Sequence, residues 1–487
     1  MSTAPATAQY GVASGHPLGV EAGLAALAAG GSAVDGVLSA AFAQWVVSGP
    51  LCGPGGELVV LLVHDAADPD SEITVFGGWS RTPLGFPVDG PVRSDGPTGA
   101  VVPGGVAGAA AASSAAGSLK WTDLFASARH YAEGHVVTPW MHRSYQGVVD
   151  KGHGEALRGF LDQPEVPRPG DEVSCSRLGK TLSRLAECGA EDFYRGELAD
   201  TLLAASRDAG GYLSAADLDA VTAEVCPAPL HTVGDLTVAV TSPPSQAGIV
   251  PELLAAADPD ADPMGAPYAE QVAPVVEREL VSRCIAGVPG TAATVAHDGV
   301  AMAAVVHSLA GVQFGTGWVA GDTGIALSNR VGTSLSTRSD LPAANPKPGA
   351  MLAHTLSAAV FRRGTRAAIV ATPGGDRQVQ WLAQAGQRFR RGAGIDEMAT
   401  GPRWFVCPVG DRFGVPAGIG KEWFLFAEPG IAWEREMSVA GYAVRRVDSG
   451  GGGMQTIERT PAGWALATDP RMAGATGDEG ATDVRRP

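Results

Sequence analysis

The sequence contains little charge, few aromatic residues and no surplus of basic residues. Of its 487 residues, 18% are charged and 6% are aromatic, and 35 lysines and arginines stand against 51 aspartates and glutamates. The resulting formal net charge of −16 repels phosphate backbones, so nucleic-acid binding is not expected. None of the six cysteines belongs to a CxxC pair, which argues against a zinc ribbon or a redox pair and favours reduced thiols.

The sequence also lacks a long hydrophobic run and the motifs of common cofactors. The longest apolar stretch, residues 36–47, contains Ser39 and Gln44 and is too short to cross a bilayer. The first residues have neither the positive nor the apolar region of a secretory signal. The glycine run at 449–453 lacks the lysine of a phosphate-binding loop, and no metal-ligand cluster is visible. We therefore expect a cytoplasmic protein that acts on a small-molecule substrate, with no cofactor, metal, nucleic-acid or membrane partner.

Small apolar residues are abundant, in patterns typical of both helices and strands. Hydrophobic residues make up 45% of the chain, and glycines number 66. Residues 18–47 predict two alanine-rich helices, and the apolar run at 57–64 predicts a buried strand. Residues 291–309 predict two strands around an Asp-Gly turn, and a strand at 367–371 precedes a helix at 377–391. This mixture predicts a layered α/β fold.

Two segments have residues that could carry out chemistry. Thr291 opens a predicted strand after the glycine-proline segment 287–290. If the chain were cut there, the threonine's own α-amine could act as the base that activates its hydroxyl. The pair Gly374-Gly375 follows another predicted strand, and its backbone N–H groups could stabilise an oxyanion. A threonine at a strand start and a glycine turn are also ordinary structural features, so the residues alone leave both interpretations open.

Nine segments of the sequence, taken in order, carry a resemblance to a known family. They are GVASGHPLGVEAGLAALAAGGSAVD at 11–35, VVSGPLCGPGGELVVLL at 46–62, VPGGVAG at 102–108, FYRGELADTLLAASRDAGGYLSAADL at 193–218, SPPSQAG at 242–248, FGTGWVAGDTGIALSNR at 314–330, TPGGDRQ at 372–378, GPRW at 401–404 and DPR at 469–471. Together they resemble the γ-glutamyltransferase family of N-terminal-nucleophile hydrolases. The resemblance implies an α/β fold of four layers, an αββα sandwich.

The resemblance also implies a precursor that cuts itself before a threonine. The products would be a large fragment, residues 1–290, and a small fragment, residues 291–487, that stay associated. Within the small fragment, we expect the polar segment at 471–487 to form a flexible tail.

The resemblance assigns the catalytic residues in turn. It places the nucleophile at Thr291, but the spacing to the Asp-Gly turn is shorter than in the family, so Thr294 is a rival. Ser308 takes the place of a second-strand hydroxyl that contacts the nucleophile. Gly374 and Gly375 take the place of the glycines that bind the oxyanion.

Several expected substrate contacts depart from the family pattern. Trp79 stands where an arginine usually binds the α-carboxylate of the γ-glutamyl group, and residues 328–333 lack the carboxylate that usually binds its α-amine. Ala310 replaces a usual asparagine. Losing both charged anchors favours a flatter or more apolar substrate than glutathione. The residues at substrate-contacting positions are Trp79, Arg81, Arg330, Thr333, His354 and Thr355.

These departures lead to three hypotheses for the function. The first is a self-processing threonine hydrolase that cleaves a carbon–carbon bond of a small amino-acid-derived intermediate. This would resemble the γ-glutamyltransferase-like enzymes that make 4-alkyl-proline precursors in lincomycin, hormaomycin and pyrrolobenzodiazepine biosynthesis. The second is amide hydrolysis or transpeptidation of glutathione-like γ-glutamyl peptides. The third is an unprocessed, inactive scaffold, which the absence of self-cleavage would reveal.

Overall fold

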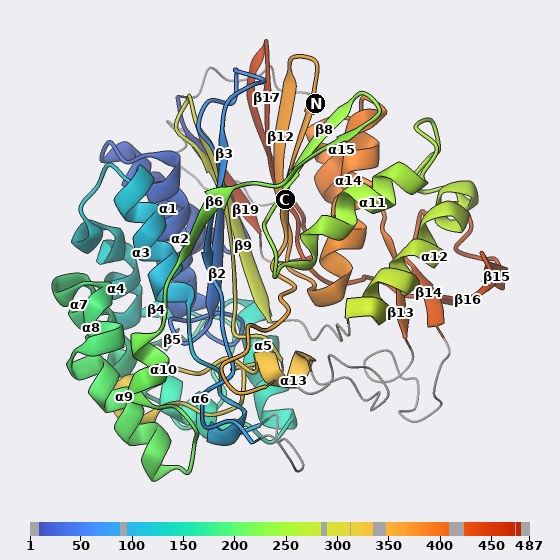
Figure 1. Cartoon of the computed structure of the whole chain (residues 1–487). Coiled ribbons are helices and arrows are strands. Elements are labelled where there is room, and N and C mark those ends of the chain that lie inside the picture. Colours follow the sequence, from blue (N-terminus) through green and yellow to red (C-terminus); the bar gives the residue numbers. More distant parts are fainter. Residues whose placement is uncertain are drawn as a thin grey trace.

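Two β-sheets lie face to face in the computed structural model, and helices cover both of their outer faces (Figure 1). These four layers confirm the predicted αββα sandwich. The structure describes residues 9–87, 95–283, 290–311, 313–334, 347–408, 423–472 and 474–478.

The first sheet has seven antiparallel strands and contains the predicted hairpin. Its strand order is β19 (Ala475–Asp478), β1 (Gly11–Ser14), β9 (Thr291–His297), β10 (Met302–Ser308), β2 (Glu57–Val63), β3 (Ile73–Gly78) and β6 (Glu224–Pro227). In the turn between β9 and β10, the Asp298 carboxylate accepts hydrogen bonds from the N–H groups of Val300 (3.0 Å) and Ala301 (2.8 Å). It also accepts one from the Ala33 N–H (2.9 Å), which ties the hairpin to the helix layer.

The second sheet has six antiparallel strands, and two smaller sheets lie outside the sandwich. The order in the second sheet is β18 (Gly463–Thr468), β17 (Gln455–Thr460), β12 (Arg366–Ala371), β11 (Ala358–Arg363), β8 (Leu236–Val240) and β7 (Leu230–Val233). The smaller sheets are β13 (Trp404–Pro408), β14 (Trp423–Ala427), β16 (Tyr442–Arg446) and β15 (Ser438–Val439), and the pair β4 (His135–Val136) and β5 (Glu172–Val173).

Both large sheets contain strands from either side of the Gly290–Thr291 peptide bond. Strands β1, β2, β3 and β6 precede that bond, whereas β9, β10 and β19 follow it in the same sheet. In the second sheet, β7 and β8 precede the bond and the other four strands follow it. Two fragments cut at this bond would therefore remain joined by sheet hydrogen bonds and shared apolar cores.

Helices α1 (Pro17–Ala28) and α2 (Ala33–Val47) pack on the first sheet and confirm the two helices predicted at 18–47. Helix α2 begins at a capping box, in which Ser32 Oγ accepts from the Asp35 N–H (3.3 Å) and the Asp35 carboxylate accepts from the Ser32 N–H (2.8 Å). The two helices approach closely because Gly23 has no side chain. A Cβ at this position would lie only 2.9 Å from the Gly36 carbonyl oxygen.

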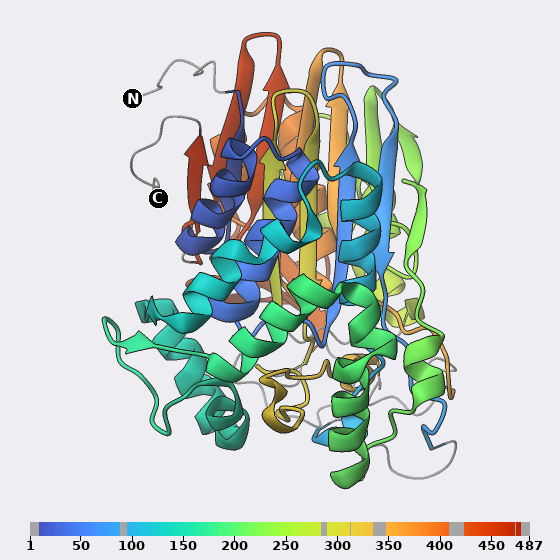
Figure 2. The same cartoon turned by 90° about the vertical axis from the view of Figure 1, so that its left-hand side faces the viewer.

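Further helices complete the two outer layers. Figure 2 faces the layer over the first sheet, which also holds α3 (Gly105–Ala116), α4 (Ala126–Glu133), α5 (Pro139–Asp150), α6 (Gly154–Phe160), α7 (Ser176–Cys188), α8 (Ala190–Arg195), α9 (Glu197–Asp208) and α10 (Ala215–Asp219). The second sheet carries α11 (Ile249–Ala256), α14 (Gln378–Arg390) and α15 (Ile395–Thr400), and α12 (Ala266–Arg283) packs on the outside of α11 and against β13. In the described ranges, no helix is both long enough and apolar enough to span a bilayer.

Strand β2 shows why the predicted strand at 57–64 is apolar throughout. Leu58 and Val60 belong to the core under the helices, whereas Val59 and Leu61 belong to the core between the two sheets. Both faces of the strand are covered, so neither set of alternating side chains meets water.

The segment at 471–487, predicted to be a flexible tail, contains part of the first sheet. Residues Ala475–Asp478 form the edge strand β19, which pairs antiparallel with β1 from Gly11↔Asp478 to Ser14↔Ala475. This part of the prediction is corrected, because ladder hydrogen bonds order a backbone whatever its side chains. Residues 479–487 lie outside the described ranges.

Candidate active site

Three polar residues lie side by side at one end of the first sheet, on the face toward the second sheet. Thr291 begins β9, Ser308 ends β10 directly opposite it, and Glu57 begins β2 directly opposite Ser308. Each is at most 2% exposed. Residues paired across antiparallel strands point to the same face, so the register alone brings these three side chains together.

Thr291 and Thr294 point to opposite faces of β9, which distinguishes the two candidate nucleophiles. Ala293 alternates in phase with Thr291 and belongs to the core between the sheets. Thr294 lies on the helix side, where its hydroxyl is hydrogen-bonded to Ser14 Oγ (2.8 Å) and donates to Gln44 Oε1 (3.3 Å). The hydroxyl of Thr294 is therefore occupied within the helix-side core, away from the row formed by Thr291.

The peptide bond before Thr291 is held by Ser308. The Ser308 hydroxyl donates a hydrogen bond to the Gly290 carbonyl oxygen and accepts one from the Ala310 N–H (2.8 Å). Thr291 Oγ1 lies 3.5 Å from Ser308 Oγ. A hydrogen-bond donor on a carbonyl oxygen polarises that carbonyl toward attack. Ala310 has φ of +53°, a left-handed conformation that asparagine adopts more readily than alanine.

The two glycines predicted to bind the oxyanion lie in the turn after strand β12. Gly374 has φ of +147° and Gly375 has φ of +65°, both in the region that favours glycine. Gln378 begins helix α14 directly after this turn. A tight turn between a strand and a helix is an arrangement that can present backbone N–H groups to a ligand.

This turn lies at the same end of the sandwich as Thr291. Ala371, the last residue of β12, pairs with Gln455 of β17. Gln455 lies beside Gly15, since a Cβ placed on that glycine would be 3.9 Å from Gln455 Nε2. The Gly15 N–H in turn donates to the Ala293 carbonyl (3.3 Å). Ala293 is two residues from Thr291, so the start of β9 and the end of β12 face each other across the sheets.

Glu57 is the centre of a buried polar cluster that was not expected from the sequence. Its carboxylate accepts hydrogen bonds from Ser80 Oγ (2.8 Å) and Ser328 Oγ (2.7 Å), and Oε2 lies 3.2 Å from Nη2 of Arg330. Burial alone would raise the pKa of Glu57, but the Arg330 charge and the two serine hydrogen bonds hold it below its ordinary value. The sequence signal that could have indicated this cluster was a glutamate at the start of an otherwise apolar strand.

Arg330, Thr355, His354 and Trp79 surround this carboxylate. Arg330 Nη1 donates to Thr355 Oγ1 (3.1 Å), and the Ser80 N–H donates to His354 Nε2 (3.3 Å). The rings of Trp79 and His354 lie 4.9 Å apart between centroids. Burial and the Arg330 charge lower the pKa of His354 to about 3, so its ring is neutral. The structure thus brings four of the six predicted substrate contacts together.

Gln246 connects this cluster to the glycine turn. Its Nε2 donates to the Gly375 carbonyl (2.9 Å) and to the Thr355 carbonyl (3.3 Å). Gln246 lies within the SPPSQAG segment, and no role was expected for it from the sequence. The structure therefore links the arginine–glutamate pair on the first sheet's side to the turn on the second sheet's side through buried hydrogen bonds.

Of the remaining two predicted substrate contacts, Arg81 does not join the buried cluster. Arg81 is exposed, and its backbone forms isolated bridges with Val102 and Met351. Thr333 lies in the short helix α13 (Arg330–Ser334), and its side chain falls outside the described part of the chain.

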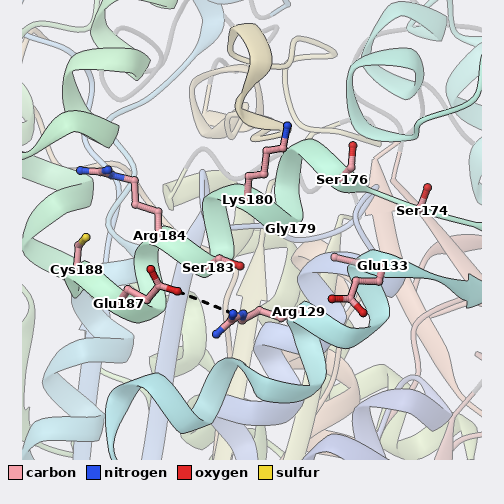
Figure 3. Close-up of a pocket in the computed structure, with 11 residues that line it drawn as sticks. Arg129, Glu133, Ser174, Ser176, Gly179, Lys180, Ser183, Arg184, Glu187 and Cys188 are labelled. Atoms are coloured by element: carbon pink, nitrogen blue, oxygen red, sulfur yellow. Dashed lines mark ion pairs between the residues drawn. The ribbon is translucent and has the colours of Figure 1, made fainter.

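A groove of about 680 Å³ lies in the outer helix layer, away from these residues (Figure 3). Helices α4 and α7 line it with Arg129, Lys180, Arg184 and Cys188, among others, and an ion pair joins Arg129 to Glu187. None of the predicted site residues lines this groove. Within the described ranges, no group of three or more His, Cys, Asp or Glu side chains is arranged to hold a metal ion.

A family model and a known protein each match almost the whole chain. The gamma-glutamyltranspeptidase family model matches residues 19–277 and 285–478. The oxamate amidohydrolase proenzyme of Klebsiella pneumoniae is 28% identical, over 94% of this chain and 96% of that protein. The glutathione hydrolase proenzyme of Bacillus subtilis is 27% identical, but the match spans only 49% of this chain and 42% of that protein.

Solved structures agree with the four-layer fold and complete the assignment. The cephalosporin acylase of Bacillus halodurans superposes with a TM-score of 0.82 at 22% identity, over 98% of this chain and 97% of that one. A structure of LmbA gives a TM-score of 0.81 at 22% identity, over 98% and 99%. These likenesses show the fold, and the family model shows the ancestry. The chain belongs to the gamma-glutamyltranspeptidase family of N-terminal-nucleophile hydrolases.

Proposed function

We propose that this protein is a self-processing hydrolase whose nucleophile is Thr291, freed as an N-terminal residue, and whose substrate is not a γ-glutamyl peptide. The observation that carries the proposal is the arrangement at the Gly290–Thr291 peptide bond. The carbonyl oxygen of Gly290 accepts a hydrogen bond from Ser308, and the Thr291 hydroxyl lies beside that serine. The relatives from Klebsiella pneumoniae and Bacillus subtilis are named as proenzymes, in keeping with a chain that is cut.

Self-cleavage would begin when Thr291 Oγ1 attacks the carbonyl carbon of Gly290. The C–N bond then breaks, the acyl group moves to the threonine oxygen, and the hydroxyl proton ends on the freed α-amine. Water hydrolyses the ester, which releases a Gly290 carboxylate and restores the Thr291 hydroxyl. Ser308 supports the first step, because its hydrogen bond strengthens as negative charge develops on the carbonyl oxygen.

The freed Thr291 would then attack the substrate in the same way, with its side-chain oxygen as the nucleophile. The α-amine of Thr291 takes the hydroxyl proton, the oxygen attacks the substrate carbonyl, and the N–H groups of Gly374 and Gly375 stabilise the oxyanion. The leaving group departs with the proton from the α-amine, and water hydrolyses the resulting ester. No other side chain is required to act as the base.

The buried ion pair argues against a γ-glutamyl substrate. Such a substrate brings an α-carboxylate and an α-ammonium group, and each needs a counter-charge in the pocket. Arg330 is already paired with Glu57, and Trp79 donates its indole N–H to Glu224 Oε2 (2.6 Å) rather than offering a positive charge. A small acyl substrate that lacks the α-ammonium group fits these residues better, because it needs one counter-charge fewer.

Two reactions remain for such a substrate. One is hydrolysis of a carbon–carbon bond in a small amino-acid-derived intermediate of 4-alkyl-proline or antibiotic biosynthesis, with a stabilised carbanion as the leaving group. The other is hydrolysis of a small amide, which is favoured by the match over almost the whole chain to a relative named oxamate amidohydrolase. Both use the same acyl-enzyme, so only the leaving group separates them.

A comparison of three substrates will test this assignment. With γ-glutamyl-p-nitroanilide we expect kcat/KM at least about 100-fold below that of the better of oxamate and a vinylogous α-keto acid, because several kcal/mol of charge pairing is missing. Ammonia release from oxamate would identify an amidase, and oxalate release from the vinylogous acid would identify a carbon–carbon hydrolase. Robust turnover of the anilide would contradict our interpretation of Trp79.

Replacing Ser308 with alanine should slow self-cleavage while leaving the sandwich folded. Loss of one donor to a developing oxyanion costs about 10²- to 10³-fold in rate, and we expect that loss in the rate of appearance of the two fragments. Ser308→Thr keeps the hydroxyl and should restore most of the rate. Time courses on denaturing gels of freshly made chain measure both variants. Unchanged cleavage in Ser308→Ala would rule out the role given to this hydroxyl.

A further inference from the structure

The glycine loop, residues 449–453, packs directly on the turn that carries Gly374 and Gly375. Gly452 has φ of +70°, and a Cβ there would lie 2.5 Å from the Pro373 carbonyl oxygen and 2.5 Å from Cζ3 of Trp381. A Cβ on Gly374 would overlap the same Trp381 ring atom. The tryptophan ring is thus held between the loop and the turn, and neither side has room for one more carbon.

Arg377 joins the two segments by hydrogen bonds. Its Nε donates to the Gly374 carbonyl (3.2 Å), and its Nη1 donates to the Gly450 carbonyl (2.9 Å). The guanidinium has donors in a fixed planar fork, so a bond to each segment sets the position of one relative to the other. One carbonyl that Arg377 holds therefore belongs to a glycine assigned to the oxyanion site.

A buried ionic cluster fixes the other side of the loop. Arg403 Nη2 donates to the Gly451 carbonyl (3.0 Å) and pairs with Asp469 (2.9 Å), and both side chains are at most 1% exposed. Glu428 accepts from the Gly450 N–H (2.6 Å) and pairs with Arg471 (2.5 Å). These residues include the arginines of the GPRW and DPR segments, whose purpose the sequence left open.

We propose that the glycine loop, through Arg377 and the Trp381 ring, is a positioning element that sets the peptide planes of Gly374 and Gly375 for oxyanion binding. The inference rests on the function proposed above. Among the described residues, the loop forms no hydrogen bond with Thr291 or Ser308, so its effect should be confined to the step that uses the glycine turn. Self-cleavage, in which Ser308 supports the carbonyl, should not depend on it.

The chain provides a matched pair of variants for the test. Gly451 and Gly452 have nearly equal φ values, +73° and +70°, so alanine meets the same backbone penalty at either position. At Gly451 nothing lies within 4 Å of the new Cβ, whereas at Gly452 it collides with Pro373 and Trp381. The difference between Gly452→Ala and Gly451→Ala therefore isolates pressure on the turn from strain in the loop.

The experiment measures acylation of Thr291 by p-nitrophenyl acetate in cleaved protein, with the rate of the uncut Thr291→Ala chain subtracted as background. We expect Gly452→Ala to lower the saturating acylation rate about 10²-fold with the apparent binding constant within twofold, because a displaced oxyanion donor affects the transition state. Gly451→Ala should stay within threefold of the parent. The parent, Gly452→Ala and Gly451→Ala should all cut themselves at the same rate.

An independent variant guards against a loop that merely misfolds. Arg377→Lys keeps the charge but loses the fork, and we expect the same selective loss of acylation with unchanged self-cleavage. Equal acylation rates in Gly452→Ala and Gly451→Ala, or parallel losses of acylation and self-cleavage, would overturn the inference. Absence of any Thr291-dependent acylation in the parent would instead refute the proposed function.

Discussion

Thr291→Ala is expected to leave the purified protein as one uncut chain without hydrolase activity. The variant lacks the hydroxyl that attacks the Gly290 carbonyl, and it also lacks the nucleophile for substrate. We expect turnover to fall on the order of 10⁶-fold, the size of loss seen when a hydrolase nucleophile is removed. Intact mass and N-terminal sequencing measure the first effect, and hydrolysis of oxamate or a vinylogous α-keto acid measures the second.

Two neighbouring variants make this result specific. Thr291→Ser keeps a hydroxyl at the same place and should still cut itself. Thr294→Val removes the hydroxyl that binds Ser14 and Gln44 on the helix side, and it should cut itself at the parental rate with some loss of stability. If Thr294→Val blocks cleavage and Thr291→Ala does not, the assignment of the nucleophile is wrong.

Local sequence signals were sufficient for the elements that position Thr291. The Asp298 side chain satisfies the N–H groups of its own turn, and Ser32 with Asp35 satisfies the start of α2, so both features follow from residues close in sequence. Alternation along β9 also shows, from sequence alone, that Thr291 and Thr294 must point to opposite faces. Which face meets the second sheet depends on packing, and no local pattern supplies that.

The polar cluster around Glu57 was beyond sequence reasoning for a physical reason. Glu57, Arg330 and Gln246 are separated by many residues, and they meet only because of strand register and the stacking of two sheets. A lone glutamate at the start of an apolar strand is a signal only once its partner is known. Closeness in sequence was equally insufficient for Arg81. It lies two residues from Trp79, but its side chain is exposed.

The edge strand β19 shows a different limit. Its sequence, Ala475–Asp478, has little apolar character, and a composition-based interpretation favours a frayed end. Its backbone pairs with β1, and Gly477 lies so close to helix α1 that a Cβ there would be 2.6 Å from the Leu24 side chain. Small side chains are required at this position because of close approach, which sequence patterns do not distinguish from disorder.

The second large effect is expected from Glu57→Gln, measured in the uncut Thr291→Ala chain so that a single polypeptide unfolds. The change keeps the shape of the side chain but removes the charge that pairs with the buried guanidinium of Arg330. Removing one partner of a buried pair costs about 3–5 kcal/mol of unfolding free energy, and we expect a loss in that range in denaturant titrations. Glu187→Gln, which breaks the exposed pair with Arg129, is the control and should change little.

The double variant Glu57→Gln with Arg330→Met separates the buried charge from the loss of contacts. Because an apolar residue of similar volume needs no counter-charge, we expect it to recover most of the stability lost in Glu57→Gln. If the double variant were as unstable as the single one, the hydrogen bonds from Ser80 and Ser328, rather than the ion pair, would be the main source of stability.

The pH dependence of stability gives a second check, and its sign follows from the lowered pKa of Glu57. Because this pKa is lower in the folded chain than its ordinary value of 4.5, the unfolded chain binds the proton more readily. The ionised carboxylate therefore contributes its full stabilisation above about pH 4.5, and this is lost as the pH falls through the folded-state pKa. We expect the unfolding free energies of the uncut chains with and without the Glu57→Gln substitution to differ most near neutral pH and to converge in acid. A constant difference between pH 7 and pH 3 would mean that Glu57 is not the charged partner of Arg330.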